Sequence, residues 1–212
     1  MGDLISEILF IGQGLFVTLE LLCGGLSIGI TFGVLLAILR YKGIASMLIQ
    51  RLISILRGTP LILQLSFVYF STPAFFGFKL SILSAGILTF GLNSSAYIAE
   101  ILRSGIENLS RGQFEAAKAL NIPSFYMWRD IVLPQVLKNI LPAMQSEVIA
   151  LLKETALIST IGGLDVMRSA QMISAEKFTY FLPLCIAGAY YYGLVLIIET
   201  LGKKLEKRGS YA

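Results

Sequence analysis

The sequence predicts an all-α protein that crosses a membrane several times, and three observations support this fold class. Of its 212 residues, 56% belong to the hydrophobic set and 14% are charged, a balance far from that of a soluble domain. Apolar stretches of about 20 residues, enough to span a bilayer as one helix, recur along the chain. A membrane barrel would need alternating segments of about 10 residues instead, so the long apolar runs favour helices.

Residues 1–212 are expected to form one transmembrane domain with five spans. Gly25, Gly29 and Gly33 recur every four residues in the first span and predict the close approach of another helix. Asp3 and Glu7 stand where a signal peptide has positive charge, so the first span should remain in the mature protein. The predicted spans cover about residues 10–39, 52–70, 82–102, 136–161 and 181–201, with a cytoplasmic segment at 103–135 and a solvated tail at 203–212.

The distribution of Lys and Arg predicts the orientation of these spans. With the N-terminus outside, thirteen of the 17 basic residues lie in inner segments, and only Lys79, Arg168 and Lys177 lie outside. Lys153, near the middle of the fourth span, is the remaining one. Cytoplasmic loops carry the excess of positive charge in membrane proteins. We therefore expect the N-terminus outside the cell and the C-terminus in the cytoplasm.

Composition also excludes several classes of function. The chain has no histidine, and Cys23 and Cys185 both lie in apolar runs, where we expect small core residues and no disulfide or metal site. The sequence also has no metal-ligand cluster and no nucleophile elbow, which argues against a membrane enzyme. The net charge is +4, but the basic side chains lie beside the spans, where membrane topology explains them better than a nucleic-acid partner does.

The cytoplasmic segment is too polar to span a bilayer, and its pattern predicts two short helices. Its first part consists of strong helix formers, Asn121 can adopt the left-handed conformation that closes a helix, and Pro123 begins the next helix. Phe125, Trp128 and Val132 then recur at helical spacing. We expect these three side chains to present an apolar face to the membrane surface or to a partner protein.

This segment resembles the EAA loop of bacterial ABC importer permeases. Glu115-Ala116-Ala117 is followed by a helix-closing position at 121, then by Ile131 and Leu133-Pro134 at the family's spacing. In that family the loop's short helix docks into a cleft of the ATPase subunit and passes its movement to the spans. The family usually has Gly where this chain has Asn121, the next most tolerant residue. The resemblance implies that the residues coupling the chain to the ATPase are Gly112, Glu115, Ala116, Ala117, Ala119, Asn121, Ile131, Leu133 and Pro134.

Three further stretches resemble the polar amino acid uptake branch of this family, namely residues 57–64 (RGTPLILQ), 96–103 (AYIAEILR) and 153–162 (KETALISTIG). The branch more often has Asp or Asn at position 154 and usually has Ser at position 156. Short members of the family have five spans and an external N-terminus. The resemblance implies the type I ABC importer permease architecture. It also implies translocation of basic or neutral polar amino acids, such as arginine, histidine or glutamine, delivered by a solute-binding protein.

Several ionisable side chains fall within or at the edges of the predicted spans, where each costs at least about 2.5–3.5 kcal/mol at the midplane and therefore needs a partner or water. Glu147 and Glu154 are seven residues apart, so they share one face of the fourth span. A glutamate carboxylate there could pair with the ammonium group of an amino acid substrate. Arg103, Ser94, Asn93 or a helix N-terminus could bind the carboxylate of that substrate. We predict substrate contacts from Asn93, Ser94, Tyr97, Glu100, Arg103, Lys153, Glu154 and Thr155.

Other interpretations of these residues remain open. Glu100 and Arg103 are three residues apart and could simply pair with each other on one helix. Glu20 and Glu199 could lie near the membrane surface if their spans are shifted or tilted. Arg57 fits a topological anchor better than a ligand.

The aromatic residues Tyr97 and 190–192 are more typical of packing or of an interface than of a binding site.

The resemblance also implies partners. Five spans form half of a translocation path, so two permease chains, identical or homologous, would pair about a two-fold axis, each resting on one of two ATPase subunits. No phosphate-loop motif occurs in the chain, so we expect ATP and Mg²⁺ on the partner ATPase, no cofactor on this chain, and no catalytic activity of its own. The expected location is the bacterial cytoplasmic (inner) membrane. A proton-coupled secondary transporter of small polar solutes is the alternative, because intramembrane acids also serve proton coupling.

Overall fold

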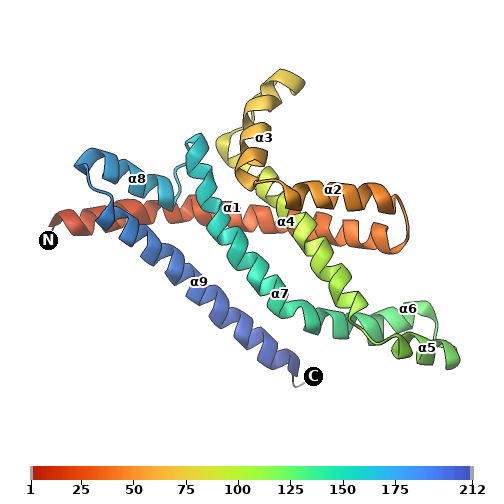
Figure 1. Cartoon of the computed structure of the whole chain (residues 1–212). Helices are drawn as coiled ribbons and strands as arrows, with labels where there is room; N and C mark the ends of the chain where they lie inside the picture. Colours follow the sequence, from red (N-terminus) through yellow and green to blue (C-terminus); the bar gives the residue numbers. More distant parts are fainter. Residues whose placement is uncertain (1, 211–212) are drawn as a thin grey trace.

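The computed structural model describes residues 2–210, and within them every regular element is helical, which confirms the all-α class (Figure 1). The helices are α1 (Gly2–Tyr41), α2 (Ser46–Gly58), α3 (Leu61–Phe76), α4 (Ile82–Glu107), α5 (Arg111–Ala119), α6 (Ser124–Tyr126), α7 (Leu133–Glu154), α8 (Val166–Lys177) and α9 (Phe181–Ser210). A π-helical turn, Met127–Val132, joins α6 to α7, and a 3₁₀ segment, Thr155–Ile161, follows α7.

The long helix α1 extends across the middle of the molecule, with α3 and α8 above it and α7 and α9 below it in the view of Figure 1. Helix α8 packs on the part of α1 near the N-terminus, and α2 returns along the opposite end of α1. Helices α4 and α7 pack on each other and run toward the end that carries α5, α6 and the C-terminus. The predicted cytoplasmic segment and the C-terminus therefore lie at the same end of the molecule.

The glycine stripe of α1 lies against α4, as the four-residue spacing predicts. A Cβ added at Gly29 would lie 3.0 Å from the Cβ of Ser94, and one added at Gly33 would lie 2.8 Å from the Cβ of Ile98. Side chains larger than hydrogen would therefore push the two helices apart. The pair formed by α1 and α4 is the most extensive contact between elements of the described chain.

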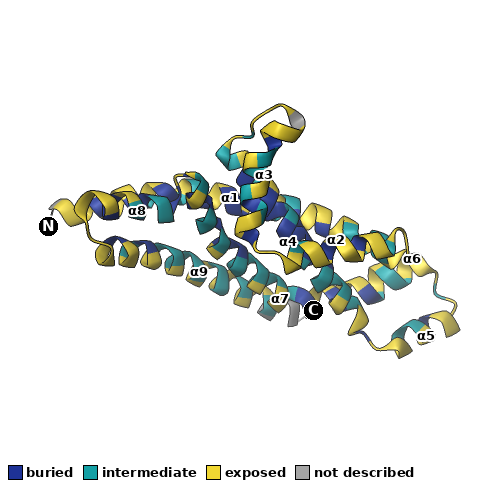
Figure 2. Cartoon of the chain, turned by 45° about the horizontal axis from the view of Figure 1, so that its top comes forward, coloured by how far each residue is buried: buried dark blue, intermediate teal, exposed yellow. Residues whose placement is uncertain are grey.

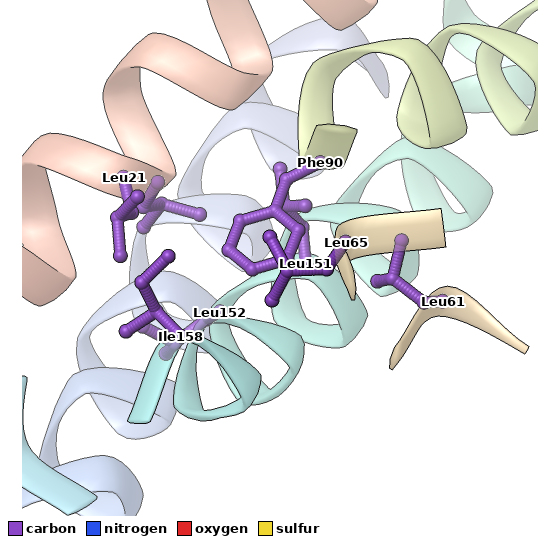
Figure 3. Close-up of a cluster of buried hydrophobic side chains, with 8 residues drawn as sticks. Leu21, Leu61, Leu65, Phe90, Leu151, Leu152 and Ile158 are labelled. Atoms are coloured by element: carbon purple, nitrogen blue, oxygen red, sulfur yellow. The ribbon is translucent and has the colours of Figure 1, made fainter. Parts of the chain in front are cut away.

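The main hydrophobic core lies where α1, α3, α4 and α7 meet (Figure 3). Phe90 of α4 is fully buried, and Leu21, Leu65 and Leu151 approach it from the three neighbouring helices. Ile158 of the 3₁₀ segment closes the cluster. Most of α9 is exposed or half-buried in the isolated chain, with only one face against the body (Figure 2).

The second predicted span, residues 52–70, is not one straight helix. Helices α2 and α3 meet at a bend of 103°, a break that the sequence analysis did not anticipate. The break falls at Thr59-Pro60, because proline has no backbone N–H to donate and its ring clashes with the preceding turn. The residue before proline is also driven out of helical conformation, and Thr59 is extended, with φ −114° and ψ 144°.

Three described helices are long and apolar enough to cross a bilayer by themselves, namely Asp3–Tyr41, Ile82–Glu107 and Phe181–Glu206, and the bent pair α2 and α3 makes a fourth if it counts as one span. Helix α7 has 22 residues but carries four charged side chains. The five-span count therefore stays a prediction. Helix α9 continues to Ser210 through most of the predicted tail, whose residues 211–212 lie outside the described range.

Cys23 and Cys185 are exposed, so our expectation that they are core residues was wrong. They lie on the faces of α1 and α9 that point away from the rest of the chain, where apolar periodicity alone cannot separate a protein-facing from an outward-facing position.

Gly14 provides a test of the packing between α1 and the turn before α8. A Cβ at Gly14 would lie 2.4–2.5 Å from backbone atoms of Asp165 and Val166, which cannot rotate away. We expect Gly14→Ala to lower the free energy of unfolding by about 1–3 kcal/mol, as overpacking does. Gly188→Ala is the control, because no described atom lies within 4 Å of its added Cβ. Thermal unfolding of both variants in mild detergent measures the difference, and equal melting temperatures would contradict the packing.

Candidate functional site

Helix α5, in the segment predicted to be cytoplasmic, ends in a Schellman motif, with Asn121 in the left-handed conformation. Asn121 has φ +51°, as its position in the motif predicts. The N–H of Asn121 donates to the carbonyl of Lys118 at 3.0 Å, and the N–H of Ile122 donates to that of Ala117 at 2.9 Å. These are the two bonds of the Schellman motif, which usually places Gly at this position. Asn121 thus keeps the turn that the EAA pattern requires.

The Glu115-Ala116-Ala117 stretch divides its side chains between an outer and an inner face. Glu115 and Ala116 are exposed, whereas Ala117 is 2% exposed. Leu120, at the end of the helix, is 74% exposed. A charged and an apolar side chain thus point away from the chain on one short helix. This is a surface that a partner can contact.

The apolar face predicted for Phe125, Trp128 and Val132 does not form, and that expectation was wrong. Val132 is 1% exposed and packs in an internal cluster, while Trp128 makes an edge contact with Tyr41 of α1, with 4.9 Å between ring centroids. Only Phe125, 66% exposed, faces outward. The physical reason is the π-helical turn, whose wider spacing rotates the side chains after residue 126 relative to an α-helix.

The exposed face of this region combines aromatic and charged groups. Arg129 lies over the rings of Phe125 and Tyr126, at 5.4 and 5.1 Å from their centroids. Its Nε also donates to Oδ1 of Asp130 at 2.6 Å. This hydrogen bond holds the pKa of the Asp130 carboxyl below its usual value. The face therefore carries an ion pair that is formed at neutral pH.

Two glutamines that sequence reasoning missed join α5 to α7. Nε2 of Gln113 donates to Oε1 of Gln135 at 3.0 Å, and Nε2 of Gln135 donates back to Oε1 of Gln113 at 2.7 Å. Gln135 also donates to the carbonyl of Ile131. The residues are far apart in sequence and follow no local period, so no pattern could have paired them. A displacement of α5 would act on the start of α7 through this bond.

The predicted substrate residues on α4 and α7 come together only in part. Asn93 and Ser94 are both buried, and Oγ of Ser94 donates to Oε1 of Glu147 at 2.7 Å, which links α4 to α7. Glu154 is half-buried at the end of α7, and Lys153 is exposed.

Thr155 is fully buried and donates to the carbonyl of Leu152, so it faces the core of this chain in the conformation described.

Glu100 and Arg103 form the ion pair that was the alternative interpretation. Nε of Arg103 donates to Oε1 of Glu100 at 2.8 Å, and Arg103 also pairs with Glu107. Nη1 of Arg40, on α1, donates to the other carboxylate oxygen of Glu100 at 2.9 Å. The Glu100 carboxylate thus has two cationic partners within this chain.

Two grooves meet beside this ion pair. One, of about 410 Å³, lies between α2 and α4, and the other, of about 290 Å³, lies between α4 and α7. Both are lined by Arg57, Tyr97 and Glu100, and the Arg57 guanidinium lies 4.9 Å from the centroid of the Tyr97 ring. Sequence reasoning took Arg57 for an anchor at the membrane surface. The structure places it on a groove wall.

Glu20 and Glu199 differ in their surroundings. Glu20 is exposed on α1, and Glu199 is half-buried on α9, where its backbone carbonyl accepts from Gln145 at 3.5 Å.

Comparison with solved structures identifies the class of protein to which this fold belongs. A chain from the crystal structure of an amino acid ABC transporter with histidines superposes with a TM-score of 0.89 at 35% identity, over 97% of each chain. A chain of the inward-facing MetNI methionine ABC transporter has a TM-score of 0.72 at 19% identity, over 94% of each chain. The fold is that of type I ABC importer permeases.

Residues 29–210 match the family described as the binding-protein-dependent transport system inner membrane component, and the chain belongs to this family. The arginine transport system permease protein ArtQ of Bacillus subtilis (strain 168) is 41% identical over 206 residues, covering 96% of this chain and 94% of ArtQ. A Rickettsia felis protein that carries the name of a glutamine transport system permease, GlnP, is 46% identical over 204 residues, covering 95% of this chain and 94% of that protein.

The left-handed position at 121 can be tested by substitution. Asn121→Gly should preserve the α5 turn, whereas Asn121→Val should destabilise it by roughly 1–2 kcal/mol, because a β-branched residue is strained at positive φ. Limited proteolysis of the segment measures this local stability. We expect cleavage after Lys118 to be several-fold faster in the valine variant and unchanged in the glycine variant. Equal cleavage of the two variants would contradict the assignment of the turn.

Proposed function

We propose that this chain is the membrane permease subunit of an ATP-driven importer that translocates polar amino acids, basic or neutral, handed to it by a solute-binding protein. The observation that carries the proposal is its similarity, over almost its whole length, to a chain of a solved amino acid ABC transporter. The relatives named for glutamine and arginine transport support the substrate class. A proton-coupled secondary transporter is not favoured, because this chain resembles ABC importer permeases in its EAA loop.

In this proposal α5 is the surface that docks on the ATPase. The exposed Glu115 and Leu120 support it, as does the Gln113–Gln135 bond, through which movement of α5 reaches α7. ATP and Mg²⁺ belong to the ATPase, and this chain contributes neither a nucleotide site nor catalysis. Closure of the ATPase pair would pull on α5, rock the spans outward, and expose the path to the binding protein.

The proposal further includes five spans in the bacterial cytoplasmic membrane, with the N-terminus outside and the C-terminus inside. The bent pair α2 and α3 then forms the second span and α7 the fourth. Charged groups on α7 fit this placement, because the bond from Ser94 gives Glu147 a partner inside the protein. Two such chains, identical or homologous, would enclose the path, and the face of α7 with Glu147 and Glu154 would line it.

The amino acid is proposed to contact the chain along this face. Glu147 and Glu154 carry negative charge for a substrate ammonium group, and the grooves at Arg57 and Tyr97 lie on the adjacent helices. Of the other predicted contacts, Asn93, Ser94 and Thr155 are buried, and Glu100 and Arg103 are paired with each other. The three buried residues would need a change of conformation to reach a substrate, whereas Glu100 already lines both grooves and Glu154 is half-buried.

Charge reversal at Glu115 tests the docking surface. Glu115→Lys should reduce the ATPase retained by the purified permease about tenfold or more, because a misplaced charge at an interface costs a few kcal/mol. Glu176→Lys, on an exposed residue of α8, is the matched control and should retain the ATPase. Quantitative mass spectrometry of the purified complexes measures the ratio. Normal association and transport in the Glu115 variant would overturn the assignment.

Neutralisation of Glu154 tests the substrate face. Glu154→Gln should raise the KM for a basic amino acid about tenfold, as expected for a hydrogen bond to a charged group of about 1.5–3 kcal/mol. Glu20→Gln, an equally conservative change on the exposed side of α1, should leave KM unchanged. The measurement is uptake into proteoliposomes that contain the ATPase and the binding protein. Unaltered kinetics and specificity in the Glu154 variant would argue against direct contact.

A further inference from the structure

Two amide side chains surround the break between α2 and α3, within the RGTPLILQ stretch. Nε2 of Gln64 donates to the Leu56 carbonyl at 2.8 Å, to the Thr59 hydroxyl oxygen at 2.8 Å and to the Thr59 carbonyl at 3.2 Å. Nδ2 of Asn93 donates to the same Leu56 carbonyl at 2.9 Å and to Oε1 of Gln64 at 3.2 Å. The two amides therefore connect three helices, α2, α3 and α4, at one point.

The Leu56 carbonyl needs these donors because of Pro60. In a continuous helix the carbonyl of Leu56 would accept from the N–H of the residue four positions on, which here is a proline without an N–H. An unsatisfied backbone carbonyl within a bilayer costs several kcal/mol. Asn93 is only 4% exposed, so its amide lies away from solvent and replaces the missing donor from another helix. The bend thus depends on side chains from outside α2.

Arg57 follows directly after this carbonyl and points into the grooves. Its guanidinium stacks on Tyr97, which is four residues after Asn93 and therefore on the same face of α4, one turn further along. The last turn of α2 is thus attached to α4 at two successive levels, by the Asn93 amide and by the Tyr97 ring. This attachment places Arg57 in the wall that both grooves share.

We propose that Gln64 and Asn93 are positioning residues that hold the bend between α2 and α3 and thereby keep Arg57 over Tyr97 where the two grooves meet. A guanidinium fixed there offers a planar cation to an anionic group in the groove, such as the carboxylate that all amino acid substrates share. Its stacking on Tyr97 limits its rotamers, so less entropy is lost when it binds. The inference about substrate rests on the proposed function, whereas the inference about the bend does not.

Isosteric substitutions test the role in transport. Gln64→Glu and Asn93→Asp keep size and shape but remove the amide donor. We expect each to raise the KM for the transported amino acid about fivefold, within the range of a lost hydrogen bond of about 0.5–1.5 kcal/mol, with kcat changed less than KM. Gln171→Glu is the control, a half-buried amide on α8 without a hydrogen-bond partner among the described residues. A fall in kcat alone, or an equal effect in the control, would overturn the proposal.

A double-mutant cycle with Arg57 distinguishes positioning from general stability. If Gln64 acts through Arg57, the Gln64→Glu change should have no further effect on KM once Arg57 is replaced by Ala, whereas independent effects would add. Gln64→Asn, whose shorter amide can still donate, should recover part of the loss. Additive KM effects would show that Gln64 does not act through Arg57 and would overturn the positioning role.

A distance measurement tests the bend without any transport assay. Spin labels at Leu48 of α2 and Leu63 of α3, which are 72% and 61% exposed, span the break. They would be introduced after replacing Cys23 and Cys185 with Ser, in assembled complex diluted with unlabelled chain. We expect a narrow distance distribution that broadens in Gln64→Glu. An unchanged distribution would overturn the role of the amides. If the parent complex fails to import amino acids, the proposed function fails, while this measurement still decides the bend.

Discussion

The close approach of α1 to α4 is the interaction on which the rest of the structure depends. On α1, Gly29 faces Ser94 of α4 and Gly33 faces Ile98, and the stretch of α4 from Gly91 to Ala99 consists mostly of Ser, Ala and Gly, with Asn93 among them. Small residues allow helices to pack tightly where lipid provides no hydrophobic driving force between them. With α1 in place, α4 can contact α2, α3 and α7 as well, so it organises both grooves and both polar links.

From this centre, a continuous set of contacts leads to the proposed ATPase surface. Helix α7 is continuous over 22 residues, with Pro142 inside it, and is roughly 33 Å long at about 1.5 Å per residue. At its start it is bonded to α5 through Gln135, and about two turns before its other end it is bonded to α4 through Glu147. A continuous helix with these two polar links can pass a displacement of α5 to the face that would line the path. Asn121 contributes by fixing the turn that connects the end of α5 to the next helix.

Much of the fold and of the coupling segment could be predicted from the sequence, because their signals are local. Length and hydropathy predict the helices, the four-residue glycine spacing predicts that another helix approaches α1 closely, and Asn121 at its motif position predicts the left-handed turn. The bend at Pro60 was missed although its signal is local, since proline-containing spans often remain continuous. Trp128 and Val132 were assigned to the wrong face, because a π-helical turn leaves no recognisable period.

What could not be predicted depends on which residues meet across the chain. Glu147 is bonded to Ser94, Gln64 to Asn93 and Gln113 to Gln135, and each of these pairs joins two elements across 22 to 53 residues of sequence. Likewise, Arg57 was taken for an anchor because nothing near it in sequence indicates the ring of Tyr97. Polar residues of a membrane protein need partners, and that requirement predicts that partners exist without predicting which ones they are.

The most direct test of the central claim is to purify the tagged chain from its own host in mild detergent and identify its stoichiometric companions by mass. We predict an ATPase with a phosphate loop, in one copy for each permease chain, together with either one permease species or two. Recovery of the chain without an ATPase, even after crosslinking in intact membranes, would contradict the importer assignment and would require another function for the α5 surface.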